Sequence, residues 1–248
     1  MSKRVEQYLN EKIGREGCIH MTLLDPEKLG GTDCALIARE VEAAGSSAIM
    51  VGGSTVSSNA ETDDVVQKIK QSCKIPIILF PNGLTGITRY ADAVWFMSLL
   101  NSTNTYYVID AQALSAPTVK RLGLEAIPMG YIIVGSGGTA GWVGQARGIP
   151  LDKPELAVAY SLAAENLGMR YIYLEAGSGA PQPVPSRMIG AVKKRCSCRL
   201  VVGGGIRDVV AAKTASMAGA EVIVTGNLVE SNDRVREKVG EIVSAIIR

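Results

Sequence analysis

Short apolar runs alternate with amphipathic segments along nearly the whole chain. Eight runs rich in Val, Ile and Leu predict strands of a parallel sheet, because strands that are buried on both faces are apolar nearly throughout. They begin at Gly17, Ser47, Ile75, Asp92, Ala126, Arg170, Arg199 and Glu221. Segments with helical periodicity follow at residues 33–44, 63–71, 106–122, 154–167, 186–194, 209–218 and 232–247. The alternation predicts an α/β protein with the architecture of a (β/α)8, or TIM, barrel.

The alternation fails once, after the third strand. Only the segment PNGLTGITRYA separates Phe80 from Asp92, and it is too short and too rich in glycine for a helix that covers a barrel strand. We therefore expect a modified TIM barrel whose third helix is degenerate or missing. The length of 248 residues is close to the roughly 250 of a typical barrel. Because no linker interrupts the pattern, residues 1–248 are predicted to form one domain.

Composition and charge narrow the class of protein. The chain has 26 basic and 24 acidic residues and no basic run, which gives no reason to expect nucleic-acid binding. The amino-terminal segment MSKRVEQYLNEKIG is too polar for a signal peptide, and no apolar stretch reaches about 18 residues. We therefore expect a cytoplasmic protein without a transmembrane segment.

The five cysteines are odd in number and scattered, which favours reduced thiols. Cys196 and Cys198 form a C-x-C pair in the turn before the seventh strand. A chain with one histidine and no second cysteine pair does not predict a structural zinc site. The single histidine, His20, lies in mid-strand, and we expect it to be buried and hydrogen-bonded rather than catalytic.

Three strands in the last third of the chain end in glycine. The segments are YIYLEAGSG from Tyr171, LVVGGGI from Leu200 and VIVTGN from Val222. Glycine leaves backbone N–H groups accessible to an anion. The carboxyl ends of strands 6, 7 and 8 are neighbours in a TIM barrel, and the last two loops are its usual phosphate site. Together the three ends predict a phosphate-binding site, although each glycine alone also suits a tight turn.

Two carboxylates lie at strand ends near this predicted site. Glu175 shares its side of the sixth strand with Tyr173, which places it at the top of the barrel interior. It is a candidate base or hydroxyl-binding group, or alternatively a structural acceptor for backbone N–H groups. Asp25 ends the first strand and Ser54 follows the second. A carboxylate and a hydroxyl beside a phosphate suit Mg²⁺, whereas an Asp-Pro pair also suits a helix cap.

These motifs together resemble the geranylgeranylglyceryl phosphate synthases and their bacterial heptaprenylglyceryl phosphate relatives. The segments that carry the resemblance are HMTLLDPEK at 20–28, VGGST at 51–55, FMSLLNSTN at 96–104, YLEAGSG at 173–179, VVGGGIR at 201–207 and VTGN at 224–227. VGGGI alone occurs in many phosphate-binding barrels. The D-P-x-K, GGS and Y-L-E-x-G-S-G motifs in one chain are far more specific.

The resemblance implies a prenyltransferase on a TIM barrel that lacks its third helix. Such enzymes join the C3 hydroxyl of sn-glycerol 1-phosphate to C1 of geranylgeranyl diphosphate with Mg²⁺, which forms the first ether bond of archaeal membrane lipids. By resemblance, Asp25 and Ser54 would hold Mg²⁺, and Glu175 would orient or deprotonate the attacking hydroxyl. The residues implied in glycerol phosphate binding are Tyr173, Leu174, Glu175, Ala176, Gly177, Ser178, Gly179, Gly204, Gly205, Gly226 and Asn227. A homo-oligomer, either a dimer or a hexamer, is also expected.

A long prenyl tail needs an apolar groove, and the missing third helix is expected to leave strand surface open for it. Alternation along the fourth strand allows only one of Trp95 and Phe96 to face that groove, and Tyr106 and Tyr107 would flank it. A bulky ring there is expected to limit the donor to C20. The glycine-rich segment around Trp142 either closes over a substrate, contacts a partner subunit, or is a plain mobile loop.

Two alternative functions stay open at this point. The first is another phosphate-binding barrel isomerase or synthase, for instance of amino-acid or thiamine biosynthesis. The Asp-Pro pair at Asp25 and the Gly-Gly-Ser segment at Ser54 argue against it. The second is a non-catalytic sensor of a phosphate metabolite, and Glu175 beside the predicted phosphate site argues against that.

Overall fold

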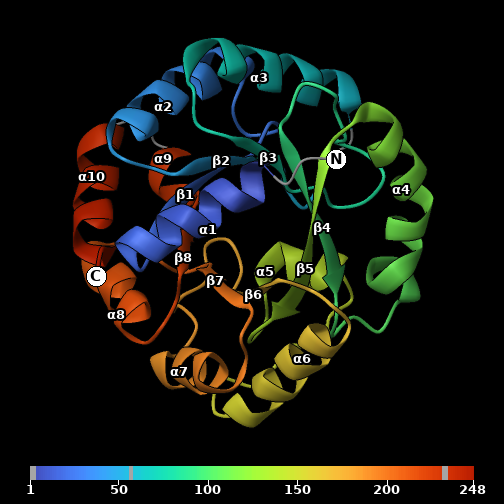
Figure 1. Ribbon diagram of the computed structural model, residues 1–248, viewed down its shortest axis with the longest axis vertical. Helices are drawn as coiled ribbons and strands as arrows, with labels where there is room; N and C mark the ends of the chain where they lie inside the picture. Colours follow the sequence, from blue (N-terminus) through green and yellow to red (C-terminus); the bar gives the residue numbers. More distant parts are fainter. Residues whose placement is uncertain (1–3, 56–57, 231–233) are drawn as a thin grey trace.

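Eight parallel strands close into a barrel in the computed structural model, which describes residues 4–55, 58–230 and 234–248 (Figure 1). The strands are β1 (Ile19–Leu24), β2 (Ala48–Val51), β3 (Ile77–Leu79), β4 (Ala93–Leu99), β5 (Glu125–Ile133), β6 (Tyr171–Glu175), β7 (Arg199–Gly203) and β8 (Val222–Thr225). Neighbours pair in chain order, and β8 closes the barrel against β1, with Ile19 opposite Val222. The predicted fold class and all eight predicted strands are confirmed.

Helices form a ring around the barrel (Figure 1). The ring consists of α2 (Gly31–Ala43), α3 (Asn59–Ser72), α4 (Ala111–Leu122), α6 (Pro154–Asn166), α7 (Ser186–Arg195), α8 (Val209–Met217) and α10 (Val235–Ile246). Three shorter elements follow β4, β5 and β8: the π-helical turn η1 (Tyr106–Asp110), α5 (Gly138–Val143) and α9 (Asn227–Glu230). The predicted helices are confirmed with small shifts at their ends; the predicted start of the last one, Asn232, lies outside the described residues. Within the described ranges, no helix combines the length and apolarity that a membrane crossing requires.

The chain passes from β3 to β4 without a helix. The structure describes every residue from 80 to 92, and these residues form only turns, bends and extended backbone. Asp92 anchors the segment, because its carboxylate accepts a hydrogen bond from the N–H of Ile77 at 2.9 Å and pairs with Lys70 of α3. The predicted loss of the third barrel helix is confirmed, and the outer face of β4 is left to η1 and α4.

One helix, α1 (Arg4–Glu16), is absent from the sequence-based prediction. It lies across the amino-terminal end of the barrel (Figure 1), where Val5 and Leu9 are buried in the inner core. Glu125, the first residue of β5, accepts hydrogen bonds from the N–H groups of Val5 and Glu6 at 2.8 and 2.9 Å. The first N–H groups of a helix have no carbonyl acceptor within that helix. The Glu125 carboxylate, from a distant strand, supplies the acceptor and stabilises the start of α1.

His20 of β1 is buried, with 1% of its surface exposed. Its Nδ1 lies 3.0 Å from the hydroxyl of Ser46 and its Nε2 lies 2.9 Å from the hydroxyl of Thr225. Burial lowers the pKa of the imidazole to about 3. The expected structural role is confirmed, because both ring nitrogens are engaged and the ring links β1 to β8.

The buried histidine makes the stability of the protein depend on pH. The pKa of His20 is about 3 in the fold and about 6.5 in an unfolded chain. Between these values the unfolded chain binds a proton that the fold excludes, so the free energy of unfolding falls as the pH drops below about 6.5, by up to about 1.4 kcal/mol per pH unit. His20→Gln should remove this part of the pH dependence. Urea unfolding of the wild type and the variant at about pH 7 and pH 5 measures the difference. An equal loss of unfolding free energy in both proteins would contradict the role given to His20.

Candidate active site

A cavity of about 380 Å³ opens at the carboxyl ends of the strands. Its mouth is formed by Glu175, which ends β6, and by residues that follow β1, β2, β6 and β8: Asp25, Lys28, Gly53, Ser54, Ser178, Gly226 and Asn227. From there the cavity continues between β4 and α4, where its lining becomes apolar. Closure of the barrel therefore joins a polar mouth and an apolar groove into one space.

Glu175 lies at the base of the mouth and is buried, with 6% of its surface exposed. Its Oε1 accepts a hydrogen bond from the N–H of Gly177 at 2.6 Å. Burial raises the pKa of Glu175, while hydrogen bonds from Gly177, Tyr173 and Tyr131 lower it in part. Glu175 accepts a backbone N–H, as the structural interpretation of the sequence expects. It also lines the cavity, and its role as a base or hydroxyl-binding group stays a prediction.

Three aromatic rings pack beneath this carboxyl group. The centroids of Tyr131 and Tyr173 lie 5.2 Å apart, and the ring of Phe80 lies 5.5 Å from the first and 5.7 Å from the second. Tyr131 and Tyr173 are paired in register on β5 and β6. The rings exclude water from below Glu175, and burial together with the charge of Glu175 raises the pKa of both tyrosines well above 10.

Glycine at the end of β7 makes room for these side chains. A Cβ atom on Gly203 would overlap the hydroxyl of Tyr173, and one on Gly204 would overlap the Glu175 carboxylate. Gly204 also has a φ of +79°, which other residues rarely adopt. These glycines therefore do more than form a tight turn, since they allow Glu175 to approach the backbone of the β7 loop.

Side chains tie the three glycine-bearing loops together. The hydroxyl of Ser178, after β6, donates to Oδ1 of Asn227, after β8, at 2.6 Å. Arg207, after β7, donates through Nη2 to the carbonyl oxygens of Gly179 and Ala180, each at 2.8 Å. The strand ends that the sequence predicts to gather around a phosphate are therefore in direct contact.

Asp25 lies on the opposite side of the mouth. Its Oδ1 accepts a hydrogen bond from the N–H of Glu27 at 3.1 Å, so it caps a turn; α2 begins only at Gly31 and has no side-chain cap. A Cβ on Gly53 would lie 2.5 Å from both carboxylate oxygens, so this glycine lets Asp25 reach the backbone before Ser54. Burial raises the pKa of Asp25. Carboxylate and hydroxyl oxygens are the donors that Mg²⁺ takes, so Asp25 and Ser54 fit this ion.

The apolar groove runs along one face of α4. Ala111, Ser115 and Val119, spaced four residues apart, line it over about 12 Å. Trp95 and Phe96 of β4 both line the cavity, from opposite faces of the strand. The ring of Trp95 lies in the barrel interior, 5.1 Å from the ring of Tyr171, whereas Phe96 packs on the outer side of β4. Because α4 covers that outer side, Phe96 is the ring of the two that faces α4 across the groove.

The glycine-rich segment after β5 forms a wall of the same cavity. It contains the short helix α5, from which Thr139, Ala140 and Val143 line the cavity. Trp142 points away from it, with 83% of its surface exposed. The segment therefore covers the cavity through small residues, and the proposed contact of Trp142 with a partner subunit stays a prediction.

Comparison with known proteins identifies the family. The model described as the PcrB family matches residues 9–246. The chain belongs to the PcrB family. The geranylgeranylglyceryl phosphate synthase of Thermofilum pendens is 52% identical over 245 residues, which cover 99% of this chain and 96% of that protein. The resemblance inferred from the motifs is confirmed.

Solved structures support the same family assignment. The (S)-3-O-geranylgeranylglyceryl phosphate synthase of Thermoplasma acidophilum, in complex with its substrate sn-glycerol 1-phosphate, has a TM-score of 0.95 and 40% identity, covering 100% of this chain and 99% of that one. A thiamine phosphate pyrophosphorylase from Pyrococcus furiosus has a TM-score of 0.63 and 13% identity. That likeness shows the shared barrel fold alone.

In this PcrB-family chain, the predicted site residues fall into three groups. Asp25, Ser54, Glu175, Ser178, Gly226 and Asn227 line the cavity. Gly177, Gly179, Gly204 and Gly205 form the positive-φ turns around the base of the mouth, and Tyr173 lies beneath it in the barrel. Leu174 and Ala176 point into the core outside the barrel, so only their backbone is available to a ligand. The contact of each residue with substrate stays a prediction.

Among the residues near the mouth, Lys28 and Tyr131 have no role in the sequence-based prediction. Lys28 lines the mouth and forms an ion pair with Glu230 of α9 at 2.7 Å. Tyr131 lines the cavity and hydrogen-bonds to Glu175. Lys28 is part of the D-P-x-K motif, so the motif could have indicated its place at the mouth. Tyr131 could not be assigned to the site from the sequence, because its position depends on the register of β5 against β6.

Proposed function

We propose that this protein is a geranylgeranylglyceryl phosphate synthase, which transfers the geranylgeranyl group from its diphosphate to the C3 hydroxyl of sn-glycerol 1-phosphate. The observation that carries the proposal is the single cavity with a polar mouth at Asp25 and Glu175 and an apolar groove along α4. A small phosphate ester and a long apolar donor need this combination. Membership of the PcrB family and the named relatives support it.

Glu175 is proposed to hold the attacking hydroxyl of glycerol phosphate. The hydrogen bond from Gly177 fixes Oε1 in place. A glycerol hydroxyl is far from ionised at neutral pH, so a hydrogen bond to the carboxylate that strengthens as the C–O bond forms is the expected contribution. The phosphate group is proposed to bind backbone N–H groups at Gly179, Gly205 and Asn227, where the three loops meet.

Asp25 and Ser54 are proposed to hold Mg²⁺ at the opposite side of the mouth. The bound ion would neutralise negative charge on the departing diphosphate. Lys28 brings a positive charge to the same side of the mouth, where its ammonium group is held by Glu230. The diphosphate is thus proposed to bind between Asp25 and the start of the groove, with its tail directed along α4.

The prenyl tail is proposed to lie between Phe96 and the face of α4 that carries Ser115. Tyr107 lines the same space. Trp95 also lines the cavity, but its ring packs against Tyr171 inside the barrel. We therefore propose Phe96 as the main limit on tail length, and the role of Trp95 stays a prediction. The cytoplasmic location and the homo-oligomer, a dimer or a hexamer, remain proposals.

The purified protein should convert sn-glycerol 1-phosphate and geranylgeranyl diphosphate to an ether lipid. Extraction of labelled glycerol phosphate into an organic phase measures the rate. Glu175→Gln should lower kcat by about a hundredfold or more, with glycerol phosphate affinity nearly unchanged, because the contact strengthens in the transition state. Glu221→Gln is the matched control, since Glu221 is also buried but lies at the start of β8, away from the cavity. A Glu175→Gln enzyme with near-normal kcat would remove Glu175 from the mechanism.

Replacement of Asp25 should separate the two substrates. Asp25→Asn should raise the Mg²⁺ concentration needed for half-maximal activity and weaken geranylgeranyl diphosphate binding, because the variant lacks the anionic ligand. Binding of glycerol phosphate should be nearly intact. Calorimetry with each substrate in turn measures the asymmetry. Loss of glycerol phosphate binding with retained diphosphate binding would show that the two phosphate sites are assigned the wrong way round.

A bulky ring at Ser115 should block the groove. Ser115→Phe should raise the KM for geranylgeranyl diphosphate by about tenfold or more, because overpacking an apolar space costs about 1–3 kcal/mol. The shorter geranyl diphosphate should be affected less. Leu114→Phe is the control, since Leu114 lies on the same helix with 62% of its surface exposed. Equal effects of the two substitutions on both donors would place the tail elsewhere.

A further inference from the structure

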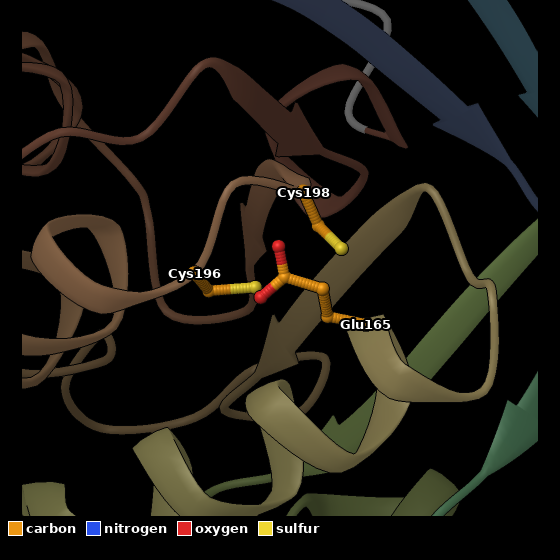
Figure 2. A group of neighbouring side chains, drawn as sticks. All are labelled: Glu165, Cys196 and Cys198. Atoms are coloured by element: carbon orange, nitrogen blue, oxygen red, sulfur yellow. The ribbon is translucent and has the colours of Figure 1, made fainter.

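Two cysteines and a glutamate converge on the face of the barrel opposite the cavity (Figure 2). Cys196 is the residue that ends α7, and Cys198 immediately precedes β7. Glu165 belongs to the last turn of α6, and its carboxylate points between the two sulfur atoms in Figure 2. One ligand atom from each of the three residues lies within 4.8 Å of the others. We propose that Cys196, Cys198 and Glu165 form a structural Zn²⁺ site, with water as the fourth ligand.

The donor set suits zinc better than other common ions. Thiolate and carboxylate are both zinc ligands, and thiolate disfavours Mg²⁺ and Ca²⁺, which take oxygen. Zn–S bonds of about 2.3 Å in a tetrahedron place two sulfur atoms about 3.8 Å apart. Donor atoms within 4.8 Å reach this geometry by side-chain rotation of Cys196 and Cys198, without a large backbone movement.

The surroundings hold the carboxylate in position and favour a cation. Ser197, between the two cysteines, donates its backbone N–H to Glu165 Oε1 at 3.2 Å, and its hydroxyl donates to the same oxygen. This orients Glu165 toward the cysteine pair. The carboxyl-terminal ends of α6 and α7 both lie at the cluster, and the negative end of a helix dipole favours a positive ion.

Both cysteines are largely withdrawn from solvent, with 5% and 7% of their surfaces exposed. The Sγ atom of Cys198 lies 3.1 Å from the carbonyl oxygen of Met169, in the turn before β6. An ion bound here would link α6, the α7–β7 turn and the starts of β6 and β7, the strands that end at Glu175 and Gly203. Because the site is on the amino-terminal face, its expected contribution is to stability and not to the reaction.

The sequence alone shows too few neighbouring ligands to predict this Zn²⁺ site. A lone C-x-C pair with one histidine does not predict a zinc site, since structural zinc usually takes four protein ligands. Glu165 is the third ligand, and it lies 31 positions before Cys196 in the printed sequence. Only packing of α6 against α7 brings it to the cysteines, so the sequence alone does not lead to the proposed site.

Metal binding by the intact protein tests the proposal. Protein purified in a non-thiol reductant and freed of metal should take up about one Zn²⁺ per chain through gel filtration. Co²⁺ should give the intense sulfur-to-metal charge-transfer band and visible bands of a tetrahedral thiolate site. Zn²⁺ at a hundredfold excess over its Kd should raise the Tm by about 5 °C or more.

Variants assign the ligands. Because loss of an outer partner of a metal ligand already lowers affinity about 10- to 100-fold, Cys196→Ser and Cys198→Ser should each lower Zn²⁺ affinity by about a hundredfold or more. Glu165→Gln should weaken binding but keep the charge-transfer band. Cys73→Ser is the matched control, because Cys73 is also a buried cysteine that ends a helix, α3. It should bind Zn²⁺ as the wild type does.

A second measurement on the wild type guards against variants that fail to fold. Bound Zn²⁺ should protect Cys196 and Cys198 from alkylation in the unmodified protein, with no change at Cys73, as read by mass spectrometry. Absence of stoichiometric Zn²⁺ and of the Co²⁺ band in the wild type would overturn the proposal and leave two hydrogen-bonded thiols. Equal loss of binding in Cys73→Ser would overturn the assignment of the ligands.

Discussion

A carboxylate is costly to bury unless hydrogen bonds replace its hydration, and this constraint governs the mouth of the barrel. Glu175 meets it with the N–H of Gly177 and the hydroxyls of Tyr131 and Tyr173. The two tyrosines pack with Phe80 beneath the carboxylate. Gly204 must lack a side chain for the carboxylate to fit. The shape of the site thus follows from how one charge is accommodated.

The missing third helix has a second consequence. In a complete barrel each strand is followed by a helix of the outer ring. Here the segment after β3 passes directly to β4 and is anchored by Asp92. The uncovered strand surface meets α4, whose groove-facing positions Ala111 and Ser115 are small. A polar substrate at the mouth and a long apolar substrate can therefore meet within one cavity.

The two faces of the barrel have separate tasks. The carboxyl-terminal face carries Asp25 and Glu175, each held by a hydrogen bond from a backbone N–H two residues further on. The amino-terminal face is closed by α1, which Glu125 anchors, and it carries the cluster of Cys196 and Cys198. This division is a general property of (β/α)8 barrels, in which substitutions on the amino-terminal face affect stability more than chemistry. It allows a stabilising device to exist without interfering with the reaction.

The sequence by itself determined the barrel, its missing helix and most residues of the mouth. Continuous apolar runs and glycine at strand ends are local signals, and the D-P-x-K and Y-L-E-x-G-S-G motifs are short enough to identify the family. α1 escaped prediction because its buried face is narrow within a highly charged segment, and Glu125, which stabilises its start, is distant in sequence.

Only the tertiary structure showed how Trp95 and Phe96 of β4 are placed, that Tyr131 supports Glu175 beside Tyr173, and what lies beside the C-x-C pair. Phe96 and Trp95 are adjacent in sequence, and only closure of the barrel puts one outside and the other inside. Tyr131 and Glu165 join their partners through strand register and helix packing. Contacts between residues far apart in the chain leave no periodic or local signal, so they become visible only when the barrel closes.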